Sequence, residues 1–184
     1  MLEFLRRRIR ARREPPAGRK LYFTVLAQSR LPAFYGSFAV PDTVPGRFEM
    51  VLLHAALVFR RLRLIGAEAQ RLSDEMFDAM TADLDRSMRE VGIGDQGVSK
   101  RMKLMAGSFY GRAQAYEQAL SGAESLDDAL RRNLYGTVAV GDDVVARMAA
   151  YVRAAAAGAD AQSFADLREG RPGFSSTPYR AGTQ

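Results

Sequence analysis

The chain has 184 residues, 27 of them lysine or arginine and 21 aspartate or glutamate, and its net charge of +6 lies entirely within residues 1–20. Because the rest of the sequence is electrically balanced, a folded surface built to cover nucleic acid is disfavoured. The absence of cysteine and the presence of one histidine exclude disulfides, thiol nucleophiles and metal sites built on several histidines.

The first predicted element is a short basic amphipathic helix over residues 1–13, which stops at Pro15 and Pro16. Apolar side chains recur at helical spacing along one edge, and arginines fill the rest of its surface. Such a helix is typical of segments that lie on an anionic membrane surface. The side chains expected to contact the anionic partner are Leu2, Phe4, Leu5, Arg6, Arg7, Arg8, Ile9, Arg10, Arg12 and Arg13. Two alternatives stay open: contact of the same arginines with ribosomal RNA, and a disordered arm that only solubilises the protein.

A second helix is predicted over Lys20–Ser29, followed by an ordered loop over residues 30–46. The loop is predicted from its helix breakers, which are Pro32, Gly36, Pro41, Pro45 and Gly46. The next helix, over Arg47–Ile65, is apolar almost all round until its arginine end. Such a pattern is typical of a helix in the centre of a core.

Four more helices are predicted in the rest of the body. Ser73 is expected to cap the first of them, and Ser125 with Asp128 resembles a capping box at the start of the third. The predicted ranges are 73–91, 98–120, 125–135 and 142–158, with a short turn around Phe164–Leu167.

No segment shows sustained β alternation, and the longest nearly apolar run, Met50–Phe59, is too short to cross a bilayer. The predicted fold class is therefore all-α: a single compact domain of six or seven helices with a basic amphipathic N-terminal helix. We expect three parts: a membrane-surface segment over residues 1–18, a helical domain over residues 19–169, and an extended or disordered tail over residues 170–184. Because residues 1–20 lack the apolar run of a secretory signal, we expect the protein to stay in the compartment where it is made.

His54 is the single candidate for acid–base chemistry. It has Met50 and Val58 one turn away on either side, so its face of the helix is apolar. This setting favours a buried, hydrogen-bonded structural histidine over a ligand contact, and no positioned catalytic partner is predictable. We therefore expect no catalytic residue.

Five methionines lie on two consecutive predicted helices: Met76, Met80, Met88, Met102 and Met105. Their spacing favours packing against each other in the core. Because methionine adapts to irregular apolar partners, a groove that holds a client protein is the alternative.

Two sequence patterns that resemble ligand-binding motifs are interpreted as structural features. Five acidic residues of the helix predicted over residues 73–91 are interpreted as its solvent-exposed face and not as a cation site. They are Asp74, Glu75, Asp78, Asp83 and Asp85. The glycines Gly92, Gly94 and Gly97 match a dinucleotide-binding spacing, but a helix precedes them where that motif needs a strand. No metal site is predicted.

Three long stretches of the sequence carry a family resemblance. They are LPAFYGSFAVPDTVPGRFEMVLLHAALVFRRLR, LSDEMFDAMTADLDRSMREVGIGD and VSKRMKLMAGSFYGRAQAYEQAL, followed by DALRRNLYG. Over roughly residues 20–136 the chain resembles the ubiquinol–cytochrome c chaperone family, the assembly factors of the cytochrome bc1 complex. The positions that match the family motifs are Leu31, Pro32, Phe34, His54, Phe109, Tyr110, Gly111 and Arg112. The mitochondrial members are longer at the N-terminus, so the resemblance suggests a bacterial member.

The resemblance implies a non-enzymatic chaperone that binds newly synthesised cytochrome b and promotes assembly of the bc1 complex. We expect it to be cytoplasmic and peripheral to the inner membrane, with nascent cytochrome b and an anionic membrane surface as partners, and with the ribosome as a further candidate. No cofactor is expected beyond a transient contact with haem. Besides the motif positions, the candidate client-binding residues are Tyr35, Phe38, Met76, Met80, Met102 and Met105. The alternatives are a haem-handling protein and an RNA- or ribosome-binding adaptor.

Overall fold

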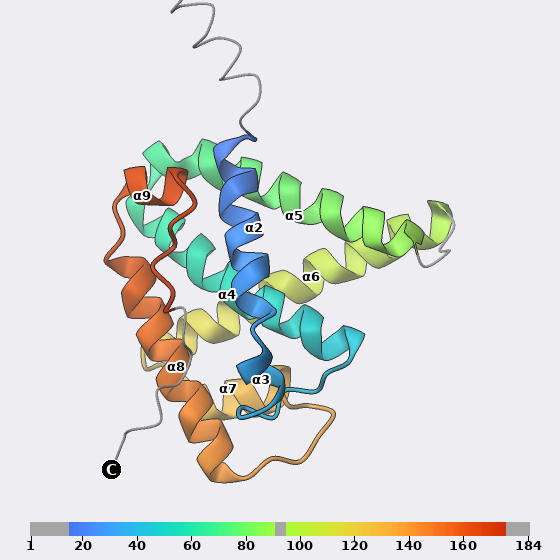
Figure 1. The fold of residues 1–184 in the computed structure, drawn as a ribbon, viewed down its shortest axis with the longest axis vertical. Helices are drawn as coiled ribbons and strands as arrows, with labels where there is room; N and C mark the ends of the chain where they lie inside the picture. The colour runs from blue at the N-terminus through green and yellow to red at the C-terminus, as the bar shows by residue number, and fades with distance from the viewer. Residues whose placement is uncertain (1–14, 91–94, 176–184) are drawn as a thin grey trace, which may run out of the picture.

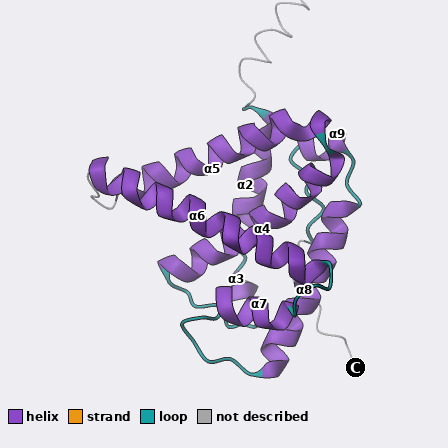
Figure 2. Ribbon diagram, turned by 180° about the vertical axis from the view of Figure 1, so that it is seen from behind, coloured by secondary structure: helices purple, strands orange, loops and turns teal. Residues whose placement is uncertain are grey.

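Helices make up all the regular structure of the described chain. The computed structural model describes residues 15–90 and 95–175, and over residues 95–106 it describes the backbone alone. These residues form α2 (Ala17–Ser29), α3 (Pro32–Tyr35), α4 (Val44–Ile65), the 3-10 helix η1 (Ala67–Ala69), α5 (Gln70–Glu90), α6 (Asp95–Leu120), α7 (Leu126–Asn133), α8 (Asp142–Asp160) and α9 (Phe164–Arg168), with no strand among them (Figures 1 and 2). The prediction of an all-α fold in a single domain is confirmed. The eight α-helices of the described ranges exceed the predicted six or seven, because α3 and α9 are single turns where a loop and a turn were expected.

α4 is the central helix. Its residues from Met50 to Val58 are all buried, as its apolar sequence predicts, and it contacts α2, α5, α6 and α8. α2 crosses α4 and α5 (Figure 1), and a β-carbon at Gly18 would lie 2.4 Å from the backbone nitrogen of Met76. α5 and α6 run side by side, and their adjacent ends project from the body (Figures 1 and 2).

The start of α4 differs from the prediction. The helix begins at Val44, three residues before the predicted Arg47, and Thr43 caps it by accepting a hydrogen bond from the backbone nitrogen of Gly46 at 3.2 Å. Pro45, which we counted as a breaker, lies in the first turn. Proline suits that turn because its missing N–H group would have no partner there.

The predicted starts of α5 and α6 are also too late. α5 begins at Gln70, directly after η1, so Ser73 lies inside the helix and is not its cap. Gly66 permits this arrangement, because its φ of 89° turns the chain between α4 and η1 without the strain that a side chain would add. α6 begins at Asp95, three residues before the predicted start at residue 98.

The caps of the later helices follow the sequence more closely. Ser125 accepts a hydrogen bond from the backbone nitrogen of Asp128 at 3.2 Å, which confirms it as the N-cap of α7. The reciprocal capping box is found instead at Ser163 and Asp166, and it opens α9. α8 begins at Asp142 as predicted.

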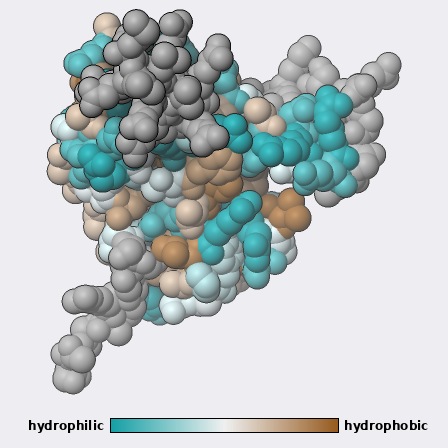
Figure 3. Space-filling view, turned by 45° about the horizontal axis from the view of Figure 1, so that its top comes forward, coloured by the Kyte–Doolittle hydropathy of each residue, from teal (hydrophilic) through white to brown (hydrophobic). Residues whose placement is uncertain are grey.

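The surface of the described residues is mixed in character. In the view of Figure 3, apolar residues show in patches between hydrophilic ones. The large hydrophobic side chains that are exposed among the described residues are Phe23, Val44, Leu64, Tyr110 and Val138. Within the described ranges, none of the helices has the length and hydropathy needed to cross a membrane.

Candidate functional site

A pocket of about 790 Å³ lies between α4, η1, α5 and α6. Its aromatic floor consists of Phe59, Phe77 and Phe109, one from each α-helix. The ring centroid of Phe59 lies 5.4 Å from that of Phe109 and 6.4 Å from that of Phe77, at interplanar angles of 67°. These are favourable edge-to-face geometries, so the contacts between the three rings stabilise the packing of the three helices. Tyr110, which is 64% exposed, lies at the edge of this floor.

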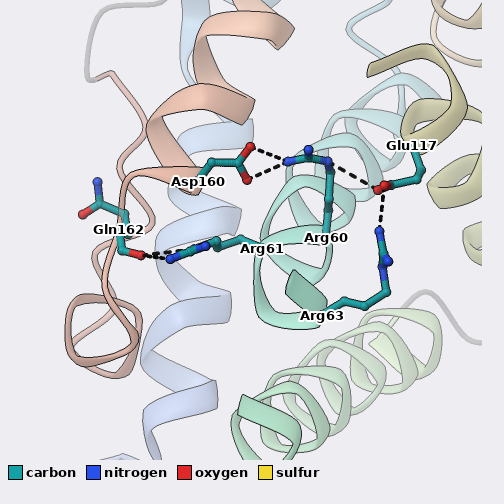
Figure 4. A network of polar contacts seen from close by, with 6 residues as sticks. All are labelled: Arg60, Arg61, Arg63, Glu117, Asp160 and Gln162. Carbon is teal, nitrogen blue, oxygen red and sulfur yellow. Dashed lines mark hydrogen bonds and ion pairs between the residues drawn. The ribbon is translucent and has the colours of Figure 1, made fainter. Parts of the chain in front are cut away.

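An ion-pair network forms one edge of the pocket (Figure 4). Arg60 donates from Nη1 to both carboxylate oxygens of Asp160 at 2.6 Å, and its Nε lies 3.4 Å from Oε2 of Glu117. Arg63 contacts the same Glu117 at 2.7 Å (Figure 4). The network joins α4 to α6 and α8, and its two cations are matched by two carboxylates.

A second edge of the pocket is formed by η1 and the first turns of α5. Ala67, Ala69, Gln70, Ser73 and Asp74 line it. The exposed carboxylate of Asp74 accepts a hydrogen bond from Nε2 of Gln70 at 2.8 Å. This edge therefore carries carboxylate and amide groups beside the aromatic floor.

His54 lies in a second aromatic cluster, in the core. It is fully buried, and its ring packs against Phe34, Tyr151 and Phe174. Nδ1 lies 2.8 Å from the carbonyl oxygen of Met50 and Nε2 lies 2.6 Å from the hydroxyl of Tyr151. Since a carbonyl oxygen only accepts, Nδ1 carries the proton and Nε2 accepts from the tyrosine. Burial lowers the pKa of His54 to about 4, against a smaller raising effect of the Met50 carbonyl. The prediction of a buried, hydrogen-bonded histidine is confirmed.

Residues 171–175 run along this cluster. Phe174 packs edge-on against His54 with centroids 5.2 Å apart, and the carbonyl oxygen of Ser175 accepts a hydrogen bond from Nε2 of Gln28 at 2.7 Å. Gly173 passes so close to Gly158 that a β-carbon on Gly158 would lie 2.4 Å from its carbonyl oxygen. We expected an extended or disordered tail from residue 170 onward. The described part of this segment, as far as Ser175, packs against the body of the protein.

The loop residues singled out from the sequence mostly face inward. Phe34 and Phe38 are buried in the His54 cluster, where each packs against Tyr151. Tyr35 is partly buried and donates its hydroxyl to the carbonyl oxygen of Ser29 at 2.7 Å. Leu31 is partly buried and Pro32 is exposed, at the start of α3.

The candidate methionines divide into two groups. Met76 and Met80 are 0% and 2% exposed, so they contribute to the core and not to the surface of the molecule. This agrees with the core packing that their spacing favours. Met102 and Met105 fall in the part of α6 whose side chains are not described.

Arg112 and Glu49 form a bidentate ion pair. Nε and Nη2 of the arginine each lie 2.5 Å from a carboxylate oxygen, and both side chains are largely buried. The pair ties α6 to α4. The neighbouring Gly111 is exposed, and a β-carbon there would meet nothing within 4 Å.

The apolar and basic residues expected to contact a membrane surface, from Leu2 to Arg13, lie outside the described residues. The described part of the chain holds no group of three or more His, Asp or Glu side chains placed to bind a metal ion.

Sequence reasoning placed Phe109 among the family motifs, but it did not join this residue to Phe59 and Phe77. It also missed Arg60, Arg63 and Glu117 as members of one network. The available signal was the arginine end of an otherwise apolar helix, which indicates that this end reaches the surface.

Comparison with known proteins gives one family and one solved structure. The family model described as ubiquinol-cytochrome C chaperone matches residues 36–174, which extends the resemblance found in the sequence to α8 and α9. The chain is 34% identical to the protein in the crystal structure of the Cbp3 homolog from Brucella abortus. That match covers 95% of this chain and 96% of that chain, with a TM-score of 0.78. No curated protein matches the sequence.

Proposed function

The chain belongs to the ubiquinol–cytochrome c chaperone family, and from this premise we propose that it is a non-enzymatic chaperone that holds newly synthesised cytochrome b during assembly of the cytochrome bc1 complex. The observation that carries the proposal is the pocket with its aromatic floor. A membrane segment that has not yet joined its complex must keep apolar side chains out of water. An apolar pocket with a few polar groups at its edge is suited to cover such side chains.

The proposed place of action is the cytoplasmic face of the inner membrane. The basic, apolar composition of residues 1–14 supports peripheral attachment to an anionic surface. Each cation near such a surface contributes on the order of 1 kcal/mol, so six arginines are enough to hold a protein without an anchor. The alternative, contact of these arginines with the ribosome, predicts co-sedimentation with ribosomes that falls steeply with salt.

The proposal includes no resident cofactor. Both ring nitrogens of His54 are hydrogen-bonded inside the core, so coordination of a haem iron would have to break one of these bonds. This burial supports a structural role for His54 over the haem-handling alternative.

Co-purification tests the proposal. The tagged protein, isolated from its own host while the bc1 complex is being assembled, should enrich cytochrome b. Tyr110→Glu, which puts a charge at the edge of the aromatic floor, should reduce that enrichment, whereas Val138→Glu should not. Val138 is the matched control, because it is also an exposed apolar residue but does not line the pocket. Absence of cytochrome b from the wild-type isolate would contradict the proposal.

A further inference from the structure

The two edges of the pocket differ in charge. On the edge formed by α4 and α6, Arg60 and Arg63 are matched by Asp160 and Glu117. The edge formed by η1 and α5 has one lining carboxylate, Asp74, and two further carboxylates near it in the sequence, Glu68 on η1 and Asp78 on α5; we call these three residues the acidic edge.

The acidic edge follows from the helical geometry of α5. Asp74 lines the pocket, and Asp78 lies one turn further along the same face. Glu68 is next in sequence to the lining residues Ala67 and Ala69, and neither Glu68 nor Asp78 lines the pocket itself. All three carboxylates are exposed, and among the described residues none of them forms an ion pair. The nearest arginine in sequence, Arg71, pairs with Glu75 instead.

We propose that the pocket binds an apolar protein segment that ends in basic residues, with the apolar side chains on the aromatic floor and the lysine or arginine at the acidic edge. The inference rests on the proposed function and specifies the kind of client segment. Membrane proteins carry an excess of lysine and arginine next to the cytoplasmic ends of their apolar helices. An apolar floor beside Asp74, a carboxylate without an ion-pair partner among the described residues, with Glu68 and Asp78 near it in the sequence, has the complementary pattern.

The selectivity should be modest and sensitive to salt. An exposed ion pair changes affinity by up to about five-fold, and the effect weakens as ionic strength rises. The aromatic floor should therefore provide most of the affinity, and the acidic edge should select which end of a segment is held.

Three peptides test the inference with the full-length protein. They share one apolar 12-residue core and end in two lysines, two serines or two glutamates, and their binding is measured by fluorescence anisotropy at low and high salt. We expect affinity to fall in the order lysine, serine, glutamate, with the three converging at high salt. Asp74→Asn should reduce the advantage of the lysine peptide, whereas Asp128→Asn, an exposed carboxylate on α7, should leave it unchanged.

Three outcomes would overturn the inference. Equal affinity for the three peptides would mean that the acidic edge selects nothing. Preference for the glutamate peptide would assign an anionic partner. Full binding of the lysine peptide to Tyr110→Ser, which removes an apolar side chain from the pocket without adding charge, would place the peptide outside the pocket.

The inference and the proposed function fail separately. If cytochrome b co-purifies but the peptides show no order, the inference is wrong and the proposed function stands. If the peptides show the order but cytochrome b is absent from the isolate, the proposed function is wrong.

Discussion

Tyr151 donates its hydroxyl hydrogen to Nε2 of His54 across 2.6 Å, and this bond joins α8 to α4 in the core. The same hydroxyl oxygen accepts from Nε2 of Gln28 at 3.2 Å, which adds α2 to the connection. Three helices that are far apart in the sequence thus meet at one phenol. The bond requires a neutral imidazole, since a protonated ring has no lone pair left to accept.

Acidification should therefore destabilise the fold through His54. The folded pKa of about 4 lies below the ordinary value of 6.5, so the unfolded chain takes up the proton first as pH falls. The stabilisation is complete above pH 6.5 and is lost between pH 6.5 and about 4. Urea unfolding at intervals from pH 7 to pH 4.5 measures it. His54→Gln should have a flatter pH dependence than the wild type over this range, and parallel curves would contradict the prediction.

Tyr151→Phe should lower the free energy of unfolding by about 1–3 kcal/mol, because it leaves the acceptor of His54 without its donor inside the core. Denaturant unfolding at pH 7 gives the value. Tyr110→Phe removes the hydroxyl from an exposed tyrosine and should have almost no effect. Equal stability of the two variants would show that the buried bond contributes nothing net.

Arg112→Lys should destabilise the protein although it keeps the charge, because an ammonium group cannot make the two parallel bonds to Glu49. Loss of one bond to a charged group in a largely buried pair costs about 1.5–3 kcal/mol. Thermal unfolding compares it with Arg132→Lys, whose pair with Glu124 is more exposed. A smaller loss for Arg112→Lys than for the control would contradict this account.

Two glycine substitutions should have opposite effects. Gly158→Ala should destabilise the protein by roughly 1–3 kcal/mol, because the new methyl group would overlap the backbone of Gly173. Gly111→Ala should stabilise it by up to about 1 kcal/mol, since alanine is the better helix former and the site is open. The midpoints of denaturant unfolding would contradict the structure if both changes acted in the same direction.

Removal of residues 1–14 should release the protein from vesicles that contain anionic lipid, because these residues carry six arginines. Vesicle co-sedimentation at low and high salt measures the loss, and vesicles of neutral lipid are the control. Unchanged binding of the shortened chain would contradict the role of this segment in attachment.

The sequence predicted the bodies of the long helices well and their starts poorly. α4 follows from an apolar run and α8 from its opening aspartates, because burial and helix-end electrostatics are local properties of the sequence. Pro45 and Ser73 misled the assignment of starts, since each residue is compatible with the first turns of a helix as well as with a cap or a breaker.

The candidate site was harder to predict. The burial of His54 followed from its neighbours along one helix. The pocket combines Phe59, Phe77 and Phe109 from three helices, and their contact depends on how the helices cross. Periodicity within one helix carries no information about that crossing. The family motifs identified Phe109 and Tyr110 without showing what they face.

The aromatic floor exists only when α4, α5 and α6 are assembled, so whatever fills it binds the native state and not the unfolded chain. Occupancy must then raise the unfolding temperature by mass action, and an occupant at 100 times its dissociation constant adds about 2.7 kcal/mol. The unfolding temperature of the protein thus reports how much of the pocket is occupied. A thermal-shift assay can therefore rank candidate segments by affinity without a label on either partner.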